Sequence, residues 1–523
     1  MRSLGFVSLL AILMISAVLM QSVHIAHAHQ PAVLSDGQMP FAAWAMPLAT
    51  AAPTRVFGKP VPYASGGDPA AAVVVADLNG DGKLDVVVAN QGPYAVSVLL
   101  GNGDGTLQAP VSYVVGGEEP TSIAVGDVNG DGHPDLIVAT NYEVGNGFSG
   151  GVAVLLGKGD GTFEAPVSYS SGGFEAISVA IADVDGDGHP DLIVANQCSI
   201  AADCGVYPSS SVGVLHGNGD GTFEAPVSFV SGYGTDGMAV VDVNRDGAVD
   251  LIVAGEGDIV GVMLGNGDGT FQSVVAYDLG GFSSSIAVED VNGDGKLDVV
   301  GGVICPTACP SAALSVLLGN GDGTFQTPIL SSLPTEDLFS SIAIRDLDGD
   351  GKPDVVLASF NSASAEVLLG NGDGTFQAPQ KYLAGLRQML SVAVADLDAD
   401  GKPDLLAAGK CGKCAGTNLN LQVLLNRFDA PASVALTSSP NPSLVDQAVT
   451  FTATVTSNPP VPDGAVITFF ASKNNSGTGT TKNGAAHFTT SFSRAETYTV
   501  KASYPGDLFH KTSSGTVKQA VSP

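Results

Sequence analysis

Positive charge is scarce in this sequence. Lys and Arg number 21 of 523 residues against 52 Asp and Glu, which gives a formal net charge of −31. No basic stripe is available to meet phosphate groups, so nucleic acid is not an expected partner. Charged residues are only 14% and aromatic residues only 6%, whereas Gly numbers 67. This balance favours an all-β protein with many turns over a helical one.

Familiar catalytic motifs are also lacking. The chain has no His-Glu-x-x-His and no Gly-x-Ser-x-Gly, and residues 56–428 contain only His133, His189 and His216. We therefore expect no enzyme and assign no catalytic residue, although a carboxylate pair of the kind used in glycoside chemistry is compatible with so acidic a chain.

Long apolar runs are missing except at the N-terminus. Arg2 is followed by an apolar run over residues 4–20 and by the small-x-small sequence Ala26-His27-Ala28. This pattern predicts a signal peptide over residues 1–28, cleaved near Ala28, with an uncleaved membrane anchor as the alternative. Residues 29–55, which include the single Trp44, are interpreted as a flexible leader. The protein is thus predicted to be secreted or held at the cell surface.

Cysteines are few and fall as near neighbours in loops. Six residues form the pairs Cys198/Cys204, Cys305/Cys309 and Cys411/Cys414. Local disulfides that staple long loops fit an exported protein. The redox spacing of Cys411 and Cys414 and a zinc site are the alternatives, but no helix is predicted to follow that pair, and zinc needs about four ligands.

One acidic nonapeptide organises the chain. It begins at Asp77 as Asp-Leu-Asn-Gly-Asp-Gly-Lys-Leu-Asp and returns six more times, at steps of 48 to 59 residues. The seven copies hold 24 of the 52 Asp and Glu residues. Acidic residues concentrated in a few short loops indicate cation sites rather than a generally acidic surface. Acidic turns that serve only solubility are the alternative.

The residue types of the nonapeptide suit calcium, which takes about six to eight hard oxygen ligands. Positions 1, 3, 5 and 9 supply side-chain oxygens, and position 7 offers a main-chain carbonyl, so that its side chain is free to vary. Magnesium is disfavoured because it prefers to keep bound water. We predict up to seven structural Ca²⁺ ions, with the following metal-site residues: Asp77, Asn79, Asp81, Lys83, Asp85, Asp127, Asn129, Asp131, His133, Asp135, Asp183, Asp185, Asp187, His189, Asp191, Asp242, Asn244, Asp246, Ala248, Asp250, Asp290, Asn292, Asp294, Lys296, Asp298, Asp346, Asp348, Asp350, Lys352, Asp354, Asp396, Asp398, Asp400, Lys402 and Asp404.

Two loops depart from the pattern at position 4. Arg245 and Ala399 replace the glycine found there in the other copies, though every carboxylate remains. Arg245 is expected to weaken its site through its charge and through the left-handed backbone that the position requires. His133 and His189 occupy position 7, and we interpret them as bystanders rather than transition-metal ligands.

Each repeat is predicted to contain four antiparallel strands. In the second copy these are residues 122–127 before the acidic loop, 135–139 after it, 152–156, and 163–169 beyond a Gly-Asp hairpin turn. Four strands at this period are typical of a propeller blade.

The two ends of the repeat array complement each other. The hairpin-turn sequence occurs six times, not seven, and is missing after residues 419–425. At the other end, Phe57-Gly-Lys-Pro-Val-Pro-Tyr63 matches the fourth strand from Phe163 to Tyr169. The N-terminal strand is expected to complete the last blade, so that residues 56–428 form a closed seven-bladed β-propeller.

The composition changes from about Pro431 to one rich in Thr, Ser and Val, with alternating strands such as residues 449–455. Short strands with polar turns predict an immunoglobulin-type β-sandwich over residues 431–523, without the cysteine pair of antibody domains.

These patterns resemble known families. The acidic loops, with Val-Leu-Leu-Gly-Asn-Gly-Asp-Gly-Thr-Phe and a following Pro-Val-x-Tyr, resemble FG-GAP/VCBS repeats over about residues 57–426. The tail resembles bacterial Ig-like domains in residues 464–469 and 498–507. The resemblance implies a calcium-binding propeller like that of integrin α chains, in extracellular or surface proteins used for adhesion or glycan contact.

The loops at the opposite end of each repeat from the acidic loops differ from copy to copy. They are the expected binding face for an extracellular protein or glycan, unless their aromatic residues simply pack between blades. We therefore predict a secreted, calcium-stabilised binding or adhesion module, with a polysaccharide-active hydrolase or lyase as the alternative. The aromatic residues of this face are Tyr94, Tyr142, Phe148, Phe174, Tyr207, Tyr233, Phe282, Phe339 and Phe360.

Overall fold

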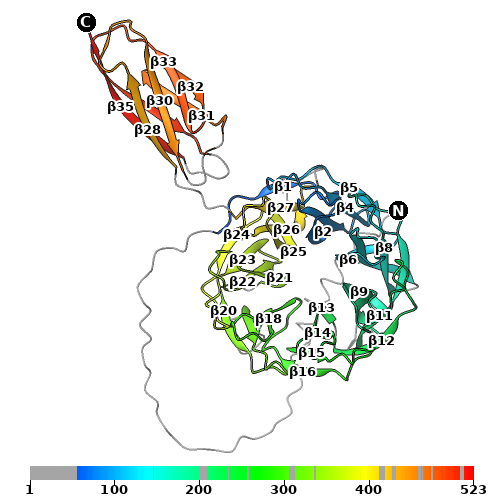
Figure 1. Cartoon of the computed structure of the whole chain (residues 1–523). Coiled ribbons are helices and arrows are strands. Elements are labelled where there is room, and N and C mark those ends of the chain that lie inside the picture. The colour runs from blue at the N-terminus through cyan, green and yellow to red at the C-terminus, as the bar shows by residue number, and fades with distance from the viewer. Residues whose placement is uncertain are drawn as a thin grey trace, which may run out of the picture. The chain divides into compact units, whose positions relative to one another are not determined.

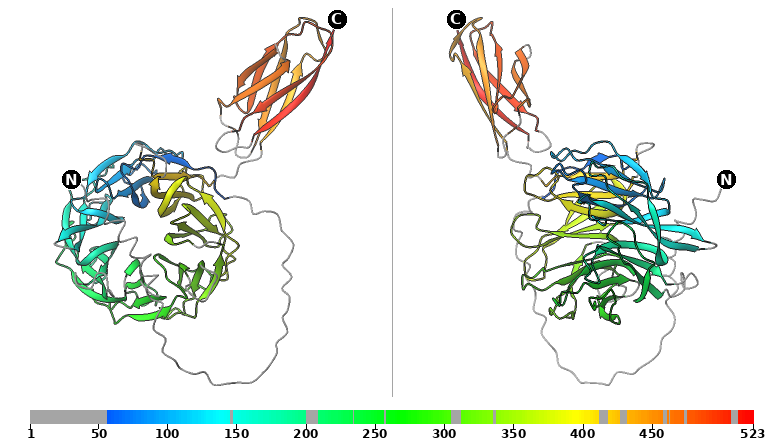
Figure 2. Two further views of the ribbon diagram at one scale, coloured as in Figure 1. Left: turned by 180° about the vertical axis from the view of Figure 1, so that it is seen from behind. Right: turned by 45° about the vertical axis from the view of Figure 1, so that its right-hand side comes forward.

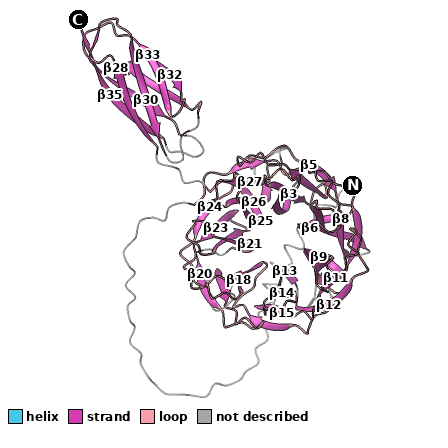
Figure 3. Ribbon diagram, viewed as in Figure 1, coloured by secondary structure: helices cyan, strands magenta, loops and turns pink. Residues whose placement is uncertain are grey.

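The computed structural model confirms the all-β class. No described residue is helical, so no described helix is long and apolar enough to cross a membrane (Figure 3). The predicted signal peptide and leader, including Trp44, lie outside the described residues. The structure describes residues 56–144, 147–199, 209–233, 235–255, 258–304, 312–334, 337–411, 418–426, 432–457, 461, 463–472, 475–506 and 512–523.

Residues 56–426 repeat one arrangement of strands around the acidic loops. In every repeat the first strand ends one residue before the loop, and the second strand begins with the last Asp of the loop. The first strands are β2 (Ala70–Ala76), β6 (Glu118–Gly126), the second half of β9 (Val167–Ala182), β13 (Thr235–Val241), β17 (Ile286–Glu289), β21 (Phe339–Arg345) and β25 (Leu386–Ala395). The second strands are β3 (Asp85–Asn90), β7 (Asp135–Val144), β10 (Asp191–Cys198), β14 (Asp250–Gly255), β18 (Asp298–Ile304), β22 (Asp354–Ser359) and β26 (Asp404–Cys411).

Two further strands follow in each repeat. The third strands are β4 (Ala95–Leu99), β8 (Gly147–Leu155), β11 (Ser209–Leu215), β15 (Ile259–Met263), β19 (Ala312–Leu317), β23 (Ser364–Leu368) and β27 (Leu421–Leu424). The fourth strands are β5 (Val111–Val114), the first half of β9, β12 (Val227–Tyr233), β16 (Val275–Asp278), β20 (Ile329–Leu333), β24 (Gln380–Leu383) and β1 (Val61–Tyr63). In Figure 1 the first strands lie toward the centre of the array and the fourth strands toward its rim.

The strands form six sheets rather than seven separate ones. Five sheets have four strands, and the sixth has seven, in the order β12-β11-β10-β9-β8-β7-β6. The large sheet arises because β9 is both the fourth strand of one repeat and the first strand of the next. Phe174 in β9 pairs with Ser149 of β8 and also with Cys198 of β10, so the ladder is not interrupted between these repeats.

The hydrophobic cores lie between neighbouring repeats. The second and third strands are buried runs of Val, Ile, Leu, Ala and small residues, as expected for strands covered on both faces. One core, for example, joins Val87 and Val96 of the first repeat to Leu136 and Phe163 of the second. A repeat therefore cannot bury its strands alone and depends on its neighbours.

The first and last repeats also pack together. Strand β1 pairs antiparallel with β27, which confirms that the N-terminal strand completes the seventh repeat. The Val73 N–H donates to Ser391 Oγ across the two first strands at 3.3 Å. Another core joins Val86 and Val88 to Leu406 and other residues of the seventh repeat. Figure 2 shows the first and seventh repeats side by side, seen from behind.

Aromatic pairs connect the outer strands of successive repeats. Phe163 contacts Tyr113 edge-to-face with ring centroids 5.6 Å apart, and Phe57 contacts Tyr382 in the same way at 5.4 Å. Phe57 thus takes the place in the seventh repeat that Phe163 takes in the second, as its sequence match predicts. Comparable edge-to-face pairs join Phe223 to Tyr169, Phe271 to Phe229 and Phe325 to Tyr277.

The C-terminal segment is a separate sandwich of two sheets. Its core is built on three phenylalanines that are at most 1% exposed, Phe451, Phe469 and Phe492. One sheet has the order β28-β30-β33 and the other β29-β35-β34-β31-β32. The strands are β28 (Ser433–Ser439), β29 (Ser443–Leu444), β30 (Val449–Thr456), β31 (Val466–Ser472), β32 (Asn475–Thr480), β33 (Ala485–Thr490), β34 (Thr497–Tyr504) and β35 (Ser513–Ser522).

Removing the Phe57 ring should destabilise the contact between the two ends of the array. Phe57 is 2% exposed, so Phe57→Ala leaves a cavity, and we expect the free energy of unfolding to fall by about 3–5 kcal/mol. Urea denaturation measures this change. Val111→Ala, at a side chain that is 56% exposed, is the control with little expected effect. Equal losses in the two variants would contradict the assigned role of Phe57.

Candidate metal centres in the acidic loops

The first carboxylate of each acidic loop organises the backbone that follows it. In the loop between β2 and β3, Asp77 Oδ1 accepts the Gly80 N–H at 2.8 Å and Asp77 Oδ2 accepts the Gly82 N–H at 2.9 Å. The corresponding bonds from positions 4 and 6 are 2.6 to 3.0 Å long in the next five loops. In the seventh loop, Asp396 accepts the N–H groups of Asp400 and Gly401. The first carboxylate therefore fixes the backbone of the loop through these hydrogen bonds.

Positions 4 and 6 adopt the left-handed backbone that these hydrogen bonds require. The φ angles are 70° at Gly80 and 79° at Gly82. Arg245 and Ala399 take the same conformation, with φ angles of 64° and 55°, as predicted for position 4. The Arg245 guanidinium lies beside Gly295, 3.6 Å from the point that a Cβ would occupy there, so its charge points toward the fifth loop.

The last carboxylate of the loop is buried and holds two parts of the repeat together. Asp85 Oδ2 accepts the Leu78 N–H at 3.0 Å, and Asp85 Oδ1 accepts the Gly101 N–H at 2.7 Å. All seven position-9 side chains are 0% or 1% exposed. Because Gly101 follows the third strand, these bonds show that the acidic loop and the hairpin turn lie at the same end of the repeat. The other six clamps are made by Asp135, Asp191, Asp250, Asp298, Asp354 and Asp404.

Burial raises the pKa of every position-9 carboxyl. The pKa is raised to about 6 for Asp298 and Asp354 and to about 7 for Asp404. In all three, the negative charges of nearby loop carboxylates add to this rise, and the hydrogen bonds from backbone N–H groups oppose it. These acids are thus hard to ionise next to their neighbours. A bound cation would favour their charged form, since an opposite charge lowers a carboxyl pKa.

The middle positions are more exposed. Asn79 Oδ1 accepts the Asp81 N–H at 2.9 Å, and Asp81 Oδ1 accepts the Lys83 N–H at 3.0 Å. The hydrogen bond from the Lys83 backbone, followed by its side chain, lowers the pKa of Asp81. Lys83 Nζ lies 3.1 Å from Asp81 Oδ2, so an ion at this loop would share that carboxylate with the lysine.

The position-7 side chains lie against the neighbouring hairpin turn. The aliphatic part of Lys83 covers Gly103, and the rings of His133 and His189 cover Gly159 and Gly219 in the hairpin turns. This placement supports the interpretation of His133 and His189 as bystanders.

The donor set fits a hard cation. In three loops, carboxylate oxygens of at least three residues lie within 4.8 Å of one another. The loops with Asn at position 3 offer an amide oxygen at that place instead. Oxygen-only donors of this kind are what calcium prefers. The three carboxylate groups are Asp183, Asp185 and Asp187; Asp346, Asp348 and Asp354; and Asp396, Asp398 and Asp404.

A histidine missed by the sequence prediction lies next to the third loop. His216 Nδ1 is 3.3 Å from Asp185 Oδ2 and 3.5 Å from Asp191 Oδ1. The signal that could have found it is the alignment of the repeats, because His216 follows the third strand at a position where the other six repeats have Leu.

The aromatic residues assigned to the variable face do not all lie on a surface. Phe339 is 2% exposed and packs in the core between the fifth and sixth repeats, so its assignment to the binding face is wrong. Phe282 is 40% exposed and fits that face. Tyr94, Tyr142, Phe174 and Phe360 are half-buried. Tyr207 and the side chains of Phe148 and Tyr233 lie outside the described part of the structure.

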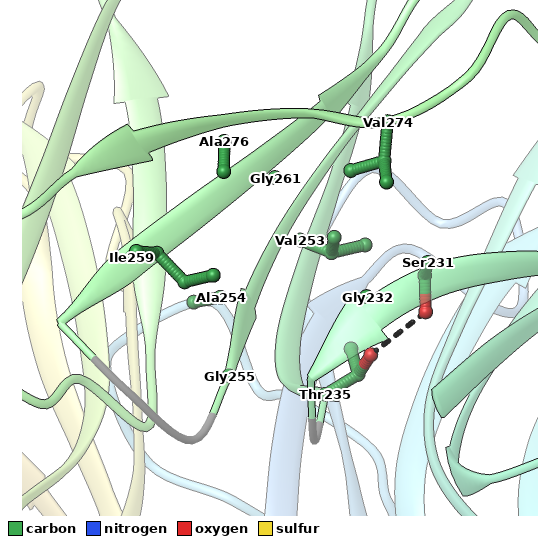
Figure 4. A pocket seen from close by; sticks show the side chains of 10 residues that line it. All are labelled: Ser231, Gly232, Thr235, Val253, Ala254, Gly255, Ile259, Gly261, Val274 and Ala276. Atoms are coloured by element: carbon green, nitrogen blue, oxygen red, sulfur yellow. Dashed lines mark hydrogen bonds between the residues drawn. The ribbon is translucent and has the colours of Figure 1, made fainter. Parts of the chain in front are cut away.

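A small apolar hollow of about 90 Å³ lies between the strands of the fourth repeat and the end of β12 in the third (Figure 4). Val253, Ile259 and Val274 line it, and Gly261 leaves space beside them. Its one internal polar contact is the hydrogen bond between Ser231 and Thr235 at 3.1 Å. The hollow offers no charged group and is too small for a typical ligand.

The described cysteines are oxidised. Cys198, at the end of β10, and Cys411, at the end of β26, are disulfide-bonded, as predicted. The residues predicted as their partners, Cys204 and Cys414, and the pair Cys305/Cys309 lie outside the described residues.

Comparison with protein families supports both parts of the chain. A model of the FG-GAP-like repeat matches residues 77–138, 142–194, 242–301, 307–357 and 346–407. A model of the bacterial Ig-like domain (group 3) matches residues 436–522. No curated protein matches the chain.

Replacing a position-9 carboxylate by an amide should break one arm of the clamp. Asp354→Asn places an NH₂ group opposite the N–H of Leu347 or Gly370, and we expect the free energy of unfolding in calcium to fall by about 1–3 kcal/mol. Urea denaturation in calcium measures it. The matched control is Asp373→Asn in the exposed hairpin turn, where the Asp373 carboxylate accepts from the N–H and the hydroxyl of Thr375. A loss as large in the control would contradict the special role of position 9.

Proposed function

The chain belongs to the FG-GAP-like repeat family and ends in a bacterial Ig-like domain, and from this premise we propose that it is a secreted, calcium-stabilised binding or adhesion module. The observation that carries the proposal is the difference between the two ends of the repeats. One end has an acidic loop of the same pattern in all seven repeats and the same hairpin turn in six of them, whereas the loops at the other end differ in length and sequence.

We infer that the repeats close into a seven-bladed β-propeller. The pairing of β1 with β27, the hydrogen bond from Val73 to Ser391 and the core shared by the first and seventh repeats support closure. Each repeat supplies four strand segments, and β9 supplies two of them because it runs through from one repeat to the next. Closure leaves no open end of the array with an uncovered core.

Calcium in this scaffold would be structural. Each loop brings three or four carboxylates together, and seven divalent ions would change the formal charge from −31 to about −17. Positions 1, 3, 5 and 9 would hold the ion through oxygen atoms. The ion would offset the repulsion among these groups and stabilise the charged form of the buried position-9 carboxylate.

The ligand would bind at the variable end of the repeats. Partly exposed aromatic side chains such as Phe282 suit contact with a protein surface or with the apolar face of a sugar. Because the variable loops do not repeat, a single composite site fits better than a ring of identical pockets. Export through the predicted signal peptide would place this face outside the cell.

One observation favours the alternative, a glycan-active enzyme. Glu119 and Glu175 stand at equivalent places near the start of first strands in adjacent repeats, away from the acidic loops. Burial raises the pKa of Glu175, and the charge of Glu119 raises it further, so the two carboxyls sense each other. Glycoside hydrolysis uses two carboxyls, of which the general acid has a raised pKa.

Calcium removal tests the structural role of the ions. We expect the apparent melting temperature to fall in EDTA and to return with excess Ca²⁺, because an ion at ten times its Kd stabilises by about 1.4 kcal/mol per site. Differential scanning calorimetry measures the shift, and excess Mg²⁺ is the control for a general charge effect. An unchanged melting temperature in EDTA would refute calcium stabilisation.

Capture without turnover tests the binding function. We expect the mature protein to bind members of a glycan and extracellular-matrix array in calcium, with no cleavage products from any bound glycan. Mass spectrometry of the recovered ligand checks for products. Products that vanish in Glu119→Gln and Glu175→Gln, both folded by circular dichroism, would replace the binding proposal with the enzyme.

A further inference from the structure

We propose that the third acidic loop is a mixed nitrogen and oxygen site for a divalent transition metal of the zinc type, with His216, Asp185 and Asp191 as ligands. The inference deepens the proposed cation-binding role of the loops and sets one of the seven apart from the others.

His216 is an exception in the repeat. It follows β11 directly, at the place where the third strand leads into the hairpin turn. Its equivalents in the other six repeats are all leucine, and five of them are partly buried. A leucine there packs against the glycine-rich turn of the following repeat, as Leu156 does against Gly221. The six equivalents are Leu100, Leu156, Leu264, Leu318, Leu369 and Leu425.

The imidazole lies between two structural elements that fix its orientation. The Cε1 and Nε2 edge faces Gly269 in the hairpin turn of the fourth repeat, whose N–H donates to the Val184 carbonyl in the third loop at 3.0 Å. The Nδ1 edge faces the acidic loop. The ring is thus held with one nitrogen toward the carboxylates of Asp185 and Asp191.

The distances from Nδ1 to the two carboxylates suit two ligands that share one metal ion. This atom is buried and has no hydrogen-bond partner. Its distances to Asp185 Oδ2 and Asp191 Oδ1, 3.3 Å and 3.5 Å, are longer than a charge-assisted hydrogen bond of about 2.7–2.9 Å. Two ligands at about 2.0–2.1 Å from a tetrahedral zinc ion lie about 3.3–3.4 Å apart.

The surrounding groups complete the donor set. The ligand atoms of Asp185, Asp191 and His216 lie within 4.8 Å of one another, and Asp185 is also within that distance of Asp183 and Asp187. Asp191 is held in place by the N–H groups of Val184 and Gly217 at 2.9 Å and 2.8 Å. Second-shell bonds of this kind orient metal-binding carboxylates.

The third loop offers the oxygen-only group Asp183, Asp185 and Asp187, but the group that includes His216 differs from it in chemistry. An imidazole nitrogen suits zinc and its transition-metal neighbours, whereas calcium prefers oxygen alone. The fourth ligand of a zinc ion could come from Asp183 or Asp187 or from water. Because the other six loops have Leu in place of His216, one transition-metal site is expected in the array.

Three variants of the full chain isolate the role of His216. His216→Leu gives the third repeat the residue that the other six have, so its fold should be retained. His216→Gln keeps a polar side chain that can hydrogen-bond to the carboxylates but is a poor zinc ligand. Leu425→His puts an imidazole at the equivalent position of the seventh repeat, whose loop carries the group Asp396, Asp398 and Asp404 and also has Asp at position 3.

The experiment measures zinc in the presence of saturating calcium. Each protein is stripped with EDTA, dialysed against excess Ca²⁺ with low Zn²⁺ and analysed for both metals by mass spectrometry. We expect the wild type to keep one more zinc per chain than His216→Leu and His216→Gln, with at least a tenfold difference in zinc affinity. Leu425→His should gain one zinc. Comparison between variants removes any contribution from the other seven histidines.

Cobalt absorption provides a direct readout of nitrogen ligation. Co²⁺ in the wild type should give visible bands that are missing from both His216 variants. The proposal is overturned if His216→Gln binds as much Zn²⁺ as the wild type and gives the same Co²⁺ spectrum, since His216 would then be a partner in an ion pair only. The calcium-dependent melting temperature is measured in the same samples, and it tests the structural calcium ions independently of zinc.

Discussion

The buried position-9 carboxylate is the interaction on which each repeat depends. Asp135, for example, begins the second strand, accepts one N–H from the acidic loop and accepts another from the glycine after the third strand. Three segments of the repeat are thereby fixed to one side chain. A carboxylate without these donors would be costly to bury, and loss of one donor or of the charge would leave unpaired polar groups in the interior. The clamp thus links the local turn geometry to the packing of the sheet.

The clamp also explains why so much acid is placed at one end of the repeats. The donors around the first carboxylate shape the loop, and the buried last carboxylate closes it, but the carboxylates between and around them repel one another. Burial and this repulsion raise the pKa of the last carboxyl, to about 7 at Asp404. A cation at the centre of the loop is the simplest way to relieve both effects. The charge that makes the chain so acidic is therefore a property of the scaffold.

Much of this arrangement could be predicted from the sequence because it repeats. The period located the loops and their strands, and the match of Phe57 to Phe163 predicted that β1 would complete the last repeat. The continuous β9 could not be predicted, since the pairing of Phe174 with two strands depends on the chain direction between repeats. Phe339 was assigned to a surface because it lies in a variable segment, but its side chain points into a core between repeats. The place of a residue in a variable segment does not determine whether its side chain points to the surface or into a core.

His216 shows that a residue that departs from the repeat pattern can indicate a function that the regular positions do not. A leucine after the third strand serves only packing, so its replacement by histidine needs a reason that packing does not supply. The proposed metal ion provides one, because a cation shared with Asp185 and Asp191 would stabilise a buried imidazole nitrogen that lacks a hydrogen-bond partner. The same reasoning applies to the variable end of the array. Features that differ between repeats are free of the demands of the scaffold, and it is there that binding specificity can be built without loss of the fold.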